Sequence, residues 1–294
     1  MGEPDPLQSR ALLPELAVVP GHLFWRAAAR VSVALSEVLP AGVDIHAYAV
    51  LLALATGEAR SQQWLADTVS ISRTTMTKVA AELAEQGLVE RVRNTADRRS
   101  YALTRTPEGA AAARHWRRHA EDVEEAVMAG FTVAEREELR TLLLQVAQAG
   151  LSADTPDALR ESIPFLITRI HNRMHGQAIE ALRDLDIEPR HLGSLVVLDA
   201  KGPVAQAELA RQLGISGASV VEIADHLERV GLVERRRLET DRRTQVLHPL
   251  PPAGAVVVEG RRRGLAMSDG VLGPLNQRER KRLIVLLGRI VTGE

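Results

Sequence analysis

The chain has 294 residues, a formal net charge of −1 at pH 7 and no cysteine. This length suits two domains of roughly 150 residues, each large enough for its own core. The lack of cysteine excludes disulfides and thiolate metal sites, and the near-neutral charge argues against indiscriminate nucleic-acid binding, which requires a strongly basic protein.

The sequence also argues against a membrane protein. Its longest apolar run, around Tyr48 to Ala55, is much shorter than the ~20 residues that cross a bilayer. Its start does not read as a signal peptide. We therefore expect a soluble, cytoplasmic protein without membrane contact.

The first half predicts a helix-turn-helix followed by a β-wing. Apolar residues at helical spacing predict a long helix over 20–39. Asp44 is expected to cap a second helix, Ser61 to open a short third helix and Ser72 to cap a fourth that ends at Gly87. From Leu88 the pattern changes to two strands, 88–93 and 100–104, joined by a turn.

Two more helices complete this half, and the second half then repeats the order. The first begins at Pro107 and runs to about Met128, and the next covers 133–148. A short polar link follows, and we place the domains at 11–150 and 161–294 with a linker at 151–160. The second half is expected to form helices over 162–184, 188–199, 206–213 and 216–230, a ribbon over 232–248, and helices over 253–270 and 277–291.

The two halves share motifs in the same register. The segment from Gly87 to Arg91 returns as Gly231 to Arg235, and the Asp-Arg-Arg triplet at Asp97 returns at Asp241. Capping boxes open the last helix of both halves, at Thr132 and Asn276. Because such spacing does not arise by chance, we expect a mainly α-helical fold with small β-wings, a duplicated winged helix-turn-helix.

These elements and motifs resemble the MarR family of winged helix-turn-helix regulators over both halves. The family signature D-x-R-x5-L-T-x-x-G maps onto Asp97 to Gly109, with Arg105 where leucine is expected. In the second half the tail reads Leu250 to Gly254, after an apparent insertion of one residue. Because family members dimerise through their first and last helices, the resemblance implies a monomeric chain that is itself a pseudo-dimer.

The DNA contacts implied by this fold come from the recognition helix in the major groove and the wing beside it. The first recognition helix is rich in donors and lacks carboxylates, although a merely solvated helix face would look similar. The second carries Glu222 where the first has Lys78. We therefore expect the second helix to recognise DNA more weakly or differently, on a non-palindromic operator. The alternative is that the second domain does not contact DNA. The candidate DNA-binding residues are Ser72, Arg73, Thr74, Thr75, Thr77, Lys78, Arg93, Asp97, Arg98 and Arg99 in the first half, and Ser216, Ser219, Arg237, Asp241, Arg242 and Arg243 in the second.

Relatives often bind small aromatic or anionic effectors beside the dimerisation helices, so the scarce aromatic residues are of interest. Candidate effector contacts in the first half are His22, Trp25, Tyr48, His115 and Trp116, although a core or surface role is equally compatible, and the second half offers little beyond Phe165. The His115/His119 and His171/His175 pairs have a spacing that can hold a metal. Because no carboxylate is well placed beside them, we expect neither a metal nor a cofactor.

These features favour a DNA-binding transcriptional regulator. We expect it to be a repressor that leaves its operator when it binds a ligand. The alternative is an interaction protein that kept the fold and lost operator binding, which Glu222 favours and Arg73 opposes. An enzyme is not expected, because the sequence has no glycine-rich phosphate loop and no nucleophile with a recognisable base.

Overall fold

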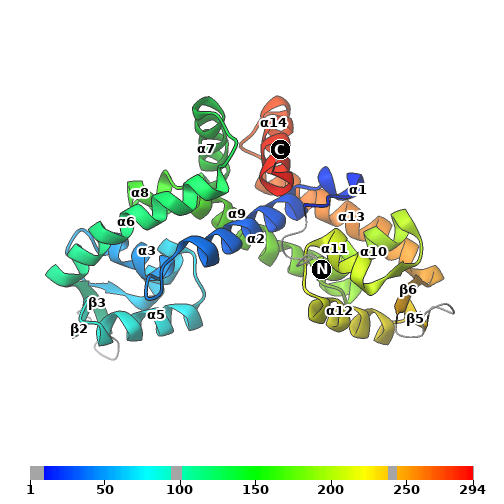
Figure 1. The fold of residues 1–294 in the computed structure, drawn as a ribbon, viewed down its shortest axis with the longest axis horizontal. Helices are drawn as coiled ribbons and strands as arrows, with labels where there is room; N and C mark the ends of the chain where they lie inside the picture. The colour runs from blue at the N-terminus through cyan, green and yellow to red at the C-terminus, as the bar shows by residue number, and fades with distance from the viewer. Residues whose placement is uncertain (1–9, 94–100, 238–243, 294) are drawn as a thin grey trace. The chain divides into compact units, whose positions relative to one another are not determined.

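The computed structural model describes residues 10–93, 101–237 and 244–293. The chain forms two compact units (Figure 1): a central unit, Val31–Arg169, and a terminal unit, which joins Met1–Arg30 to Ile170–Glu294. Both are mainly helical, and each contains a small three-stranded antiparallel sheet. This confirms the predicted fold class.

The central unit holds the first winged helix-turn-helix. In Figure 1 helix α3 lies between α6 and α5, and it contacts both. The elements are the second part of α2 (Pro20–Val38), α3 (Ile45–Ala53), β1 (Arg60–Ser61), α4 (Gln62–Val69), α5 (Arg73–Glu85), β2 (Val89–Arg93), β3 (Tyr101–Arg105), α6 (Pro107–Val127), α7 (Val133–Ala147), the 3-10 turn Gln148–Gly150, α8 (Asp157–Arg160) and the start of α9 (Ile163–Leu182).

The terminal unit holds the second winged helix-turn-helix, in which α10 contacts α13 and α12 as α3 contacts α6 and α5. Its elements are α1 (Pro14–Ala17), the first part of α2, the remainder of α9, the 3-10 turn Arg183–Leu185, α10 (Pro189–Lys201), β4 (Val204–Ala205), α11 (Gln206–Leu213), α12 (Gly217–Arg229), β5 (Val233–Arg237), β6 (Gln245–Pro249), α13 (Pro251–Val271) and α14 (Gln277–Thr292).

Side-chain caps fix where the helices of the helix-turn-helix begin, as predicted. The Asp44 carboxylate accepts hydrogen bonds from the backbone N–H groups of His46 and Ala47, at 2.6 and 3.0 Å. The Ser61 hydroxyl accepts from Trp64 N at 3.1 Å, and the Ser72 hydroxyl from Thr75 N at 3.0 Å. Each cap satisfies backbone donors that the first helical turn leaves without partners.

The two wings join the helices that follow them at the same spacing, so the insertion of one residue expected in the second half is not present. Val89 pairs with Arg105 in the first sheet and Val233 with Pro249 in the second. Helices α6 and α13 then begin two residues later, at Pro107 and Pro251. The second half therefore contains no inserted residue at this point, and Ala253, not Gly254, occupies the position of Gly109.

Short segments of each half pack into the core of the other half. Leu13 and Leu16 of α1 are buried with Leu195 of α10 in the terminal unit. Conversely, Leu159 of α8 is buried in the central-unit core, and Phe165 of α9 packs against it. The compact units therefore differ from the sequence repeats, because each repeat contributes its N-terminal segment to the other unit.

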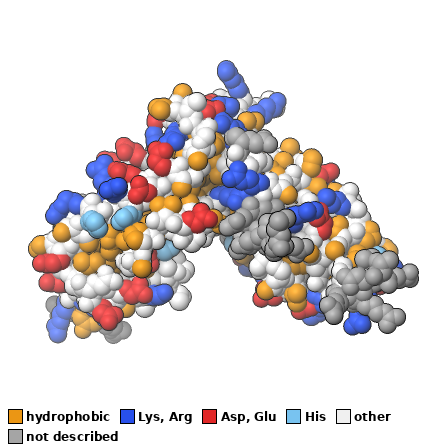
Figure 2. Space-filling model, in the orientation of Figure 1, with side chains coloured by type: hydrophobic (Ala, Val, Ile, Leu, Met, Phe, Trp, Pro, Cys, Tyr) orange, Lys and Arg blue, Asp and Glu red, His pale blue; other side chains and the backbone are white. Residues whose placement is uncertain are grey.

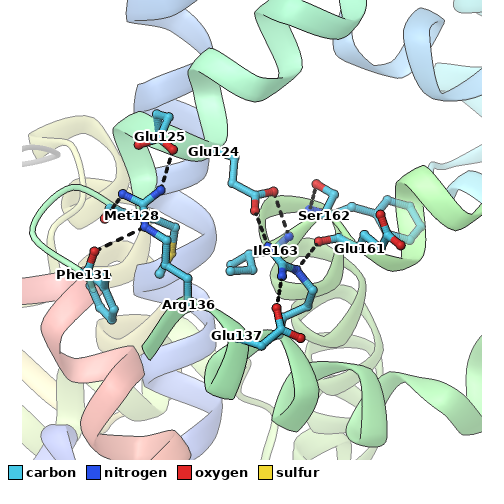
Figure 3. A network of polar contacts seen from close by, with 11 residues as sticks. Glu124, Glu125, Met128, Phe131, Arg136, Glu137, Glu161, Ser162 and Ile163 are labelled. Carbon is cyan, nitrogen blue, oxygen red and sulfur yellow. Dashed lines mark hydrogen bonds and ion pairs between the residues drawn. The ribbon is translucent and has the colours of Figure 1, made fainter. Parts of the chain in front are cut away.

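Polar contacts anchor the segment between the halves to the central unit (Figure 3). Glu124 of α6 accepts hydrogen bonds from Ile163 N and from the Arg140 guanidinium, both at 3.2 Å. Arg140 also donates to the Glu161 carbonyl at 2.7 Å, and Arg160 donates to the Thr155 carbonyl at 2.9 Å. Burial raises the pKa of the Glu124 carboxyl, although its bond with Arg140 opposes this rise. Residues 161–163, directly after the predicted linker, are therefore bonded to α6 and α7.

A buried histidine makes the terminal unit sensitive to acid. Burial, helped by the charge on Arg26, lowers the pKa of His22 from 6.5 to about 3. Because the unfolded chain binds this proton first, the free energy of unfolding should fall by about 1.4 kcal/mol per pH unit as the pH drops from 6.5 towards 3. His22→Leu should remove this component, since Leu166 occupies the corresponding position of the second half and is fully buried. Urea unfolding at pH 7.5, 6.0 and 5.0 measures it, and equal pH slopes for both proteins would contradict the account.

Candidate nucleic-acid interface

The first recognition helix, α5 with its cap Ser72, presents a polar exposed face. Arg73, Thr74, Thr77 and Lys78 are exposed, whereas Met76 and Val79 point into the core. No carboxylate lies among these exposed residues of its first two turns, and the nearest is Glu82, whose carboxylate is 3.7 Å from the Lys78 ammonium. This face is basic and rich in hydrogen-bond donors, which suits contacts with phosphates and with the acceptor groups of guanine in a major groove.

Three of the predicted hydroxyl contacts already have partners within the helix. The Ser72 and Thr75 hydroxyls lie 2.8 Å apart, and Thr77 donates to the Arg73 carbonyl at 3.0 Å. The hydroxyls of Ser72 and Thr75 therefore hold the first turn in place. Arg73, Thr74 and Lys78 are the members of the predicted set whose side chains extend from the helix.

The wings are described only in part. Arg93, at the end of β2, and Arg237, at the end of β5, are both exposed. The remaining predicted wing residues lie outside the described part of the chain: Asp97, Arg98, Arg99, Asp241, Arg242 and Arg243.

The second recognition helix, α12 with its cap Ser216, repeats the architecture with a different charge. The Ser216 and Ser219 hydroxyls are 2.9 Å apart, and Ser219 N donates to Ser216 at 3.1 Å, as in the first helix. Its exposed face carries Glu222, Asp225 and Glu228. These carboxylates would face phosphates in a complex of the same geometry. Glu222 lies 3.4 Å from the Arg190 guanidinium of α10, so its charge is partly offset, but the face lacks the excess positive charge of α5.

One arginine of the second wing is directed to this acidic helix. The Arg235 guanidinium contacts the carboxylates of Asp225 at 2.5 Å and Glu228 at 3.1 Å, and donates to the Val221 carbonyl at 3.0 Å. In the first half the corresponding residue, Arg91, is exposed, and Ala81 and Ala84 stand where the carboxylates are in the second. The two halves therefore differ both in their helix charge and in the freedom of a wing arginine.

Charge on the face of the molecule drawn in Figure 2 is mixed. Basic and acidic side chains are interspersed over the face drawn in Figure 2, consistent with the net charge of −1. Attraction to a polyanion must therefore come from local surfaces such as the exposed face of α5.

A pocket of about 880 Å³ lies in the central unit. Its wall combines aromatic side chains, Tyr48 and Phe165, with residues of the α4–α5 turn and with charged residues of α6. Burial raises the pKa of the Tyr48 hydroxyl. A volume of this size and an aromatic wall suit a small organic ligand.

The predicted effector residues do not all lie at this pocket. Tyr48 lines it, whereas Trp116 is buried in the adjacent core and His115 is exposed on α6. His22 and Trp25 belong to the terminal unit, where their rings form an edge contact at 5.4 Å. Phe165, assigned from sequence to the second half, faces the first-half pocket because α9 begins in the central unit.

Arg105 has a structural role that the sequence did not reveal. Its guanidinium donates to the Leu51 carbonyl at 3.1 Å and to the Ala55 carbonyl at 3.4 Å. It therefore holds the C-terminal end of α3 to the base of the wing, which explains why a polar residue is tolerated where the family pattern has leucine.

Within the described ranges, no group of three or more His, Asp or Glu residues could hold a metal ion. Across those same residues, no helix has the length and apolar character needed to span a membrane.

Comparison with known proteins connects both halves to one family. The model of the MarR family matches residues 41–100 and 185–244. Over 70 residues the chain is 37% identical to the uncharacterized HTH-type transcriptional regulator YcgE of Bacillus subtilis (strain 168), covering 24% of this chain and 46% of that protein. Over 104 residues it is 31% identical to a putative transcriptional regulatory protein for the hcr operon of Thauera aromatica, covering 35% and 63%. The chain thus spans about half to two thirds of the length of these relatives.

Among solved structures, a probable transcriptional regulator from Pseudomonas aeruginosa is similar at 24% identity and a TM-score of 0.42. The match covers 45% of this chain and 98% of that chain.

Proposed function

Because each half of the chain carries a MarR family domain, we propose that the protein is a sequence-specific DNA-binding transcriptional regulator that acts as an intramolecular pseudo-dimer. It represses transcription from an asymmetric operator, and a small ligand releases it. Catalysis has no part in this function.

The observation that carries the proposal is the exposed basic face of the first recognition helix. Arg73 and Lys78 project from α5 beside Thr74, and Arg93 is exposed on the adjoining wing strand. Arginine and lysine in this arrangement can bind guanine edges and phosphates in a major groove. The acidic face of α12 supports the proposed asymmetry, because the same contacts cannot form in the second half-site.

Selection of bound genomic DNA fragments tests the proposal. The full chain should enrich a limited set of fragments, and the logarithm of its affinity should fall linearly with the logarithm of the salt concentration. A chain that binds no fragment above background at 50 mM salt would contradict the proposal.

The acidic α12 also favours a second candidate, in which the second domain contacts a protein and not DNA. Substitution of Glu222 separates the two. If the second domain lies on DNA, Glu222→Gln should strengthen operator binding, because it removes a negative charge near the phosphates and releases Arg190, which lies 3.4 Å from the Glu222 carboxylate. If this domain lies off the duplex, the substitution should leave operator affinity unchanged.

The pocket beside Tyr48 is proposed as the effector site, with a small aromatic carboxylate as its ligand class. The aromatic wall supplies stacking area. The charge of the lining is mixed, with Arg117, Arg118, Arg140 and Arg169 beside Glu121, Asp122, Glu124, Glu125 and Glu161. A ligand carboxylate is therefore expected to bind at the Arg169 side of the pocket, next to the α4–α5 turn. This part of the proposal rests on the lining of the pocket.

Blocking the pocket provides the test of this effector site. Ala158 is exposed at the pocket lining, so Ala158→Trp should fill the entrance and leave the core intact. In a panel of single-ring aromatic carboxylates, at least one should weaken operator binding by wild type tenfold or more. Ala158→Trp should bind the operator with wild-type affinity, and that compound should not change this affinity. A compound that acts equally on both proteins, or a panel without effect, would contradict the pocket assignment.

A further inference from the structure

The two helix-turn-helix motifs are each bonded to an arginine that comes from the other half of the sequence. Arg169 of α9 donates to the carbonyls of Asp67 and Thr68 at the end of α4, at 3.1 and 3.4 Å, and also bonds the Ser70 hydroxyl. Arg26 of α2 donates to the Gln212 carbonyl at the end of α11, at 3.2 Å. Thr68 and Gln212 occupy corresponding positions of the two repeats.

These contacts satisfy backbone groups that the helices leave open. The last carbonyls of an α-helix have no partner within the helix, and a cation near them is favourable. Arginine suits the task because its planar group can donate to several acceptors at once. Each bonded carbonyl lies a few residues before the cap of a recognition helix, so the arginine fixes the turn from which that helix starts.

The residue at the turn differs between the halves in a way that matches its arginine. Ser70 and Gly214 both have left-handed backbone conformations, with φ of 59° and 66°. Ser70 reaches Arg169 with its hydroxyl. At Gly214 an added Cβ would lie 2.9 Å from the Arg26 guanidinium, so a side chain there would displace Arg26. The serine and the glycine are therefore not interchangeable.

The two arginines also differ in their surroundings. Arg26 is 3% exposed, and burial together with the charge of Arg30 lowers its pKa to about 10. Arg169 is partly exposed and lines the central pocket together with Val69, Ser70 and Ile71 of the turn. A molecule in the pocket would thus touch both the arginine and the turn that it holds.

We propose that Arg169 and Arg26 are positioning residues through which each half of the chain sets the recognition helix of the other half, and that Arg169 is the adjustable one of the two. The bonding itself is independent of the proposed function, whereas its consequence for DNA rests on that function. Regulation by the pocket would then act on the first recognition helix, and the second would stay fixed in its core.

Hydrogen exchange of backbone amides in the full chain tests this inference. In wild type, amides 70–76 should be less protected than amides 214–220, after correction for intrinsic rates. Arg169→Ala should increase exchange of 70–76 tenfold or more and leave 214–220 unchanged, and Arg169→Lys should recover part of the protection. Arg173→Ala, one helical turn further along α9, is the matched control and should change neither segment.

The reciprocal substitution completes the test. Arg26→Lys should increase exchange of 214–220 and leave 70–76 as in wild type, and circular dichroism checks that the variant is folded. Unchanged exchange of 70–76 in Arg169→Ala, or equal protection of both turns in wild type, would overturn the inference. If exchange behaves as expected and the chain binds no DNA, the positioning role stands and the proposed function fails.

Discussion

Replacing Arg73 by alanine is expected to weaken operator binding by about 10- to 100-fold, the 1–3 kcal/mol of a well-placed base contact. Arg73 is exposed in the first turn of α5, where recognition helices contact base edges. Lys78→Ala should weaken binding less, with a smaller salt slope, because a lysine at this position acts on phosphate as a point charge. Fluorescence anisotropy with the selected operator at several salt concentrations measures both effects.

Two matched variants make this prediction specific. Ser219→Ala in the second recognition helix should change affinity by less than threefold, because its hydroxyl is 2.9 Å from Ser216 and serves the helix cap. Arg114→Ala removes an exposed arginine of α6 and should have no effect. Equal losses for Arg73→Ala and Ser219→Ala would contradict the unequal roles of the two halves.

Replacing Gly109 by alanine is expected to lower the free energy of unfolding of the central unit by about 1–3 kcal/mol, as overpacking does elsewhere. A Cβ at Gly109 would lie 2.0 Å from the Leu88 carbonyl oxygen. Because this neighbour is backbone at the entry to the wing, the strand and α6 must separate. Denaturant unfolding of the purified chain measures the loss.

Gly254→Ala is the control, since it makes the same change near the start of the corresponding helix α13. An added Cβ at Gly254 meets no atom within 4 Å, so alanine there should raise stability by roughly 0.5–1 kcal/mol through its helix propensity. A Gly109→Ala protein as stable as wild type would show that the wing base relaxes freely. The corresponding position of the second half carries Ala253, which is buried.

Local signals in the sequence predicted the helices and strands well. Asp44, Ser61 and Ser72 are helix caps in the structure, and both capping boxes form, at Thr132 and Asn276. These features depend on a few neighbouring residues, so the sequence contains the information directly. The resemblance to the MarR family contributed a further prediction, that the wing and the recognition helix of each half bind DNA together.

Contacts between distant segments were harder to predict. The apolar side chains of Leu13 and Phe165 can be expected to be buried, but the sequence does not indicate in which core. Leu13 of the first half is buried in the core of the terminal unit, and Phe165 of the second half packs against the core of the central unit. The arginine-to-carbonyl bonds of Arg26, Arg105 and Arg169 have no sequence signature, because any backbone carbonyl can accept them. The apparent insertion before Gly254 arose from matching one glycine, whereas strand register places Ala253 there.

Hydroxyl-radical footprinting of the selected operator, with native mass spectrometry of the same complex, tests the central claim most directly. We predict one chain per duplex and protection of the DNA over two successive helical turns. In wild type, protection of the second turn should be weaker than that of the first. Arg73→Ala should abolish protection of the first turn. Two chains per duplex, or a symmetrical footprint over a perfect palindrome, would contradict a single chain with two unequal DNA-binding halves.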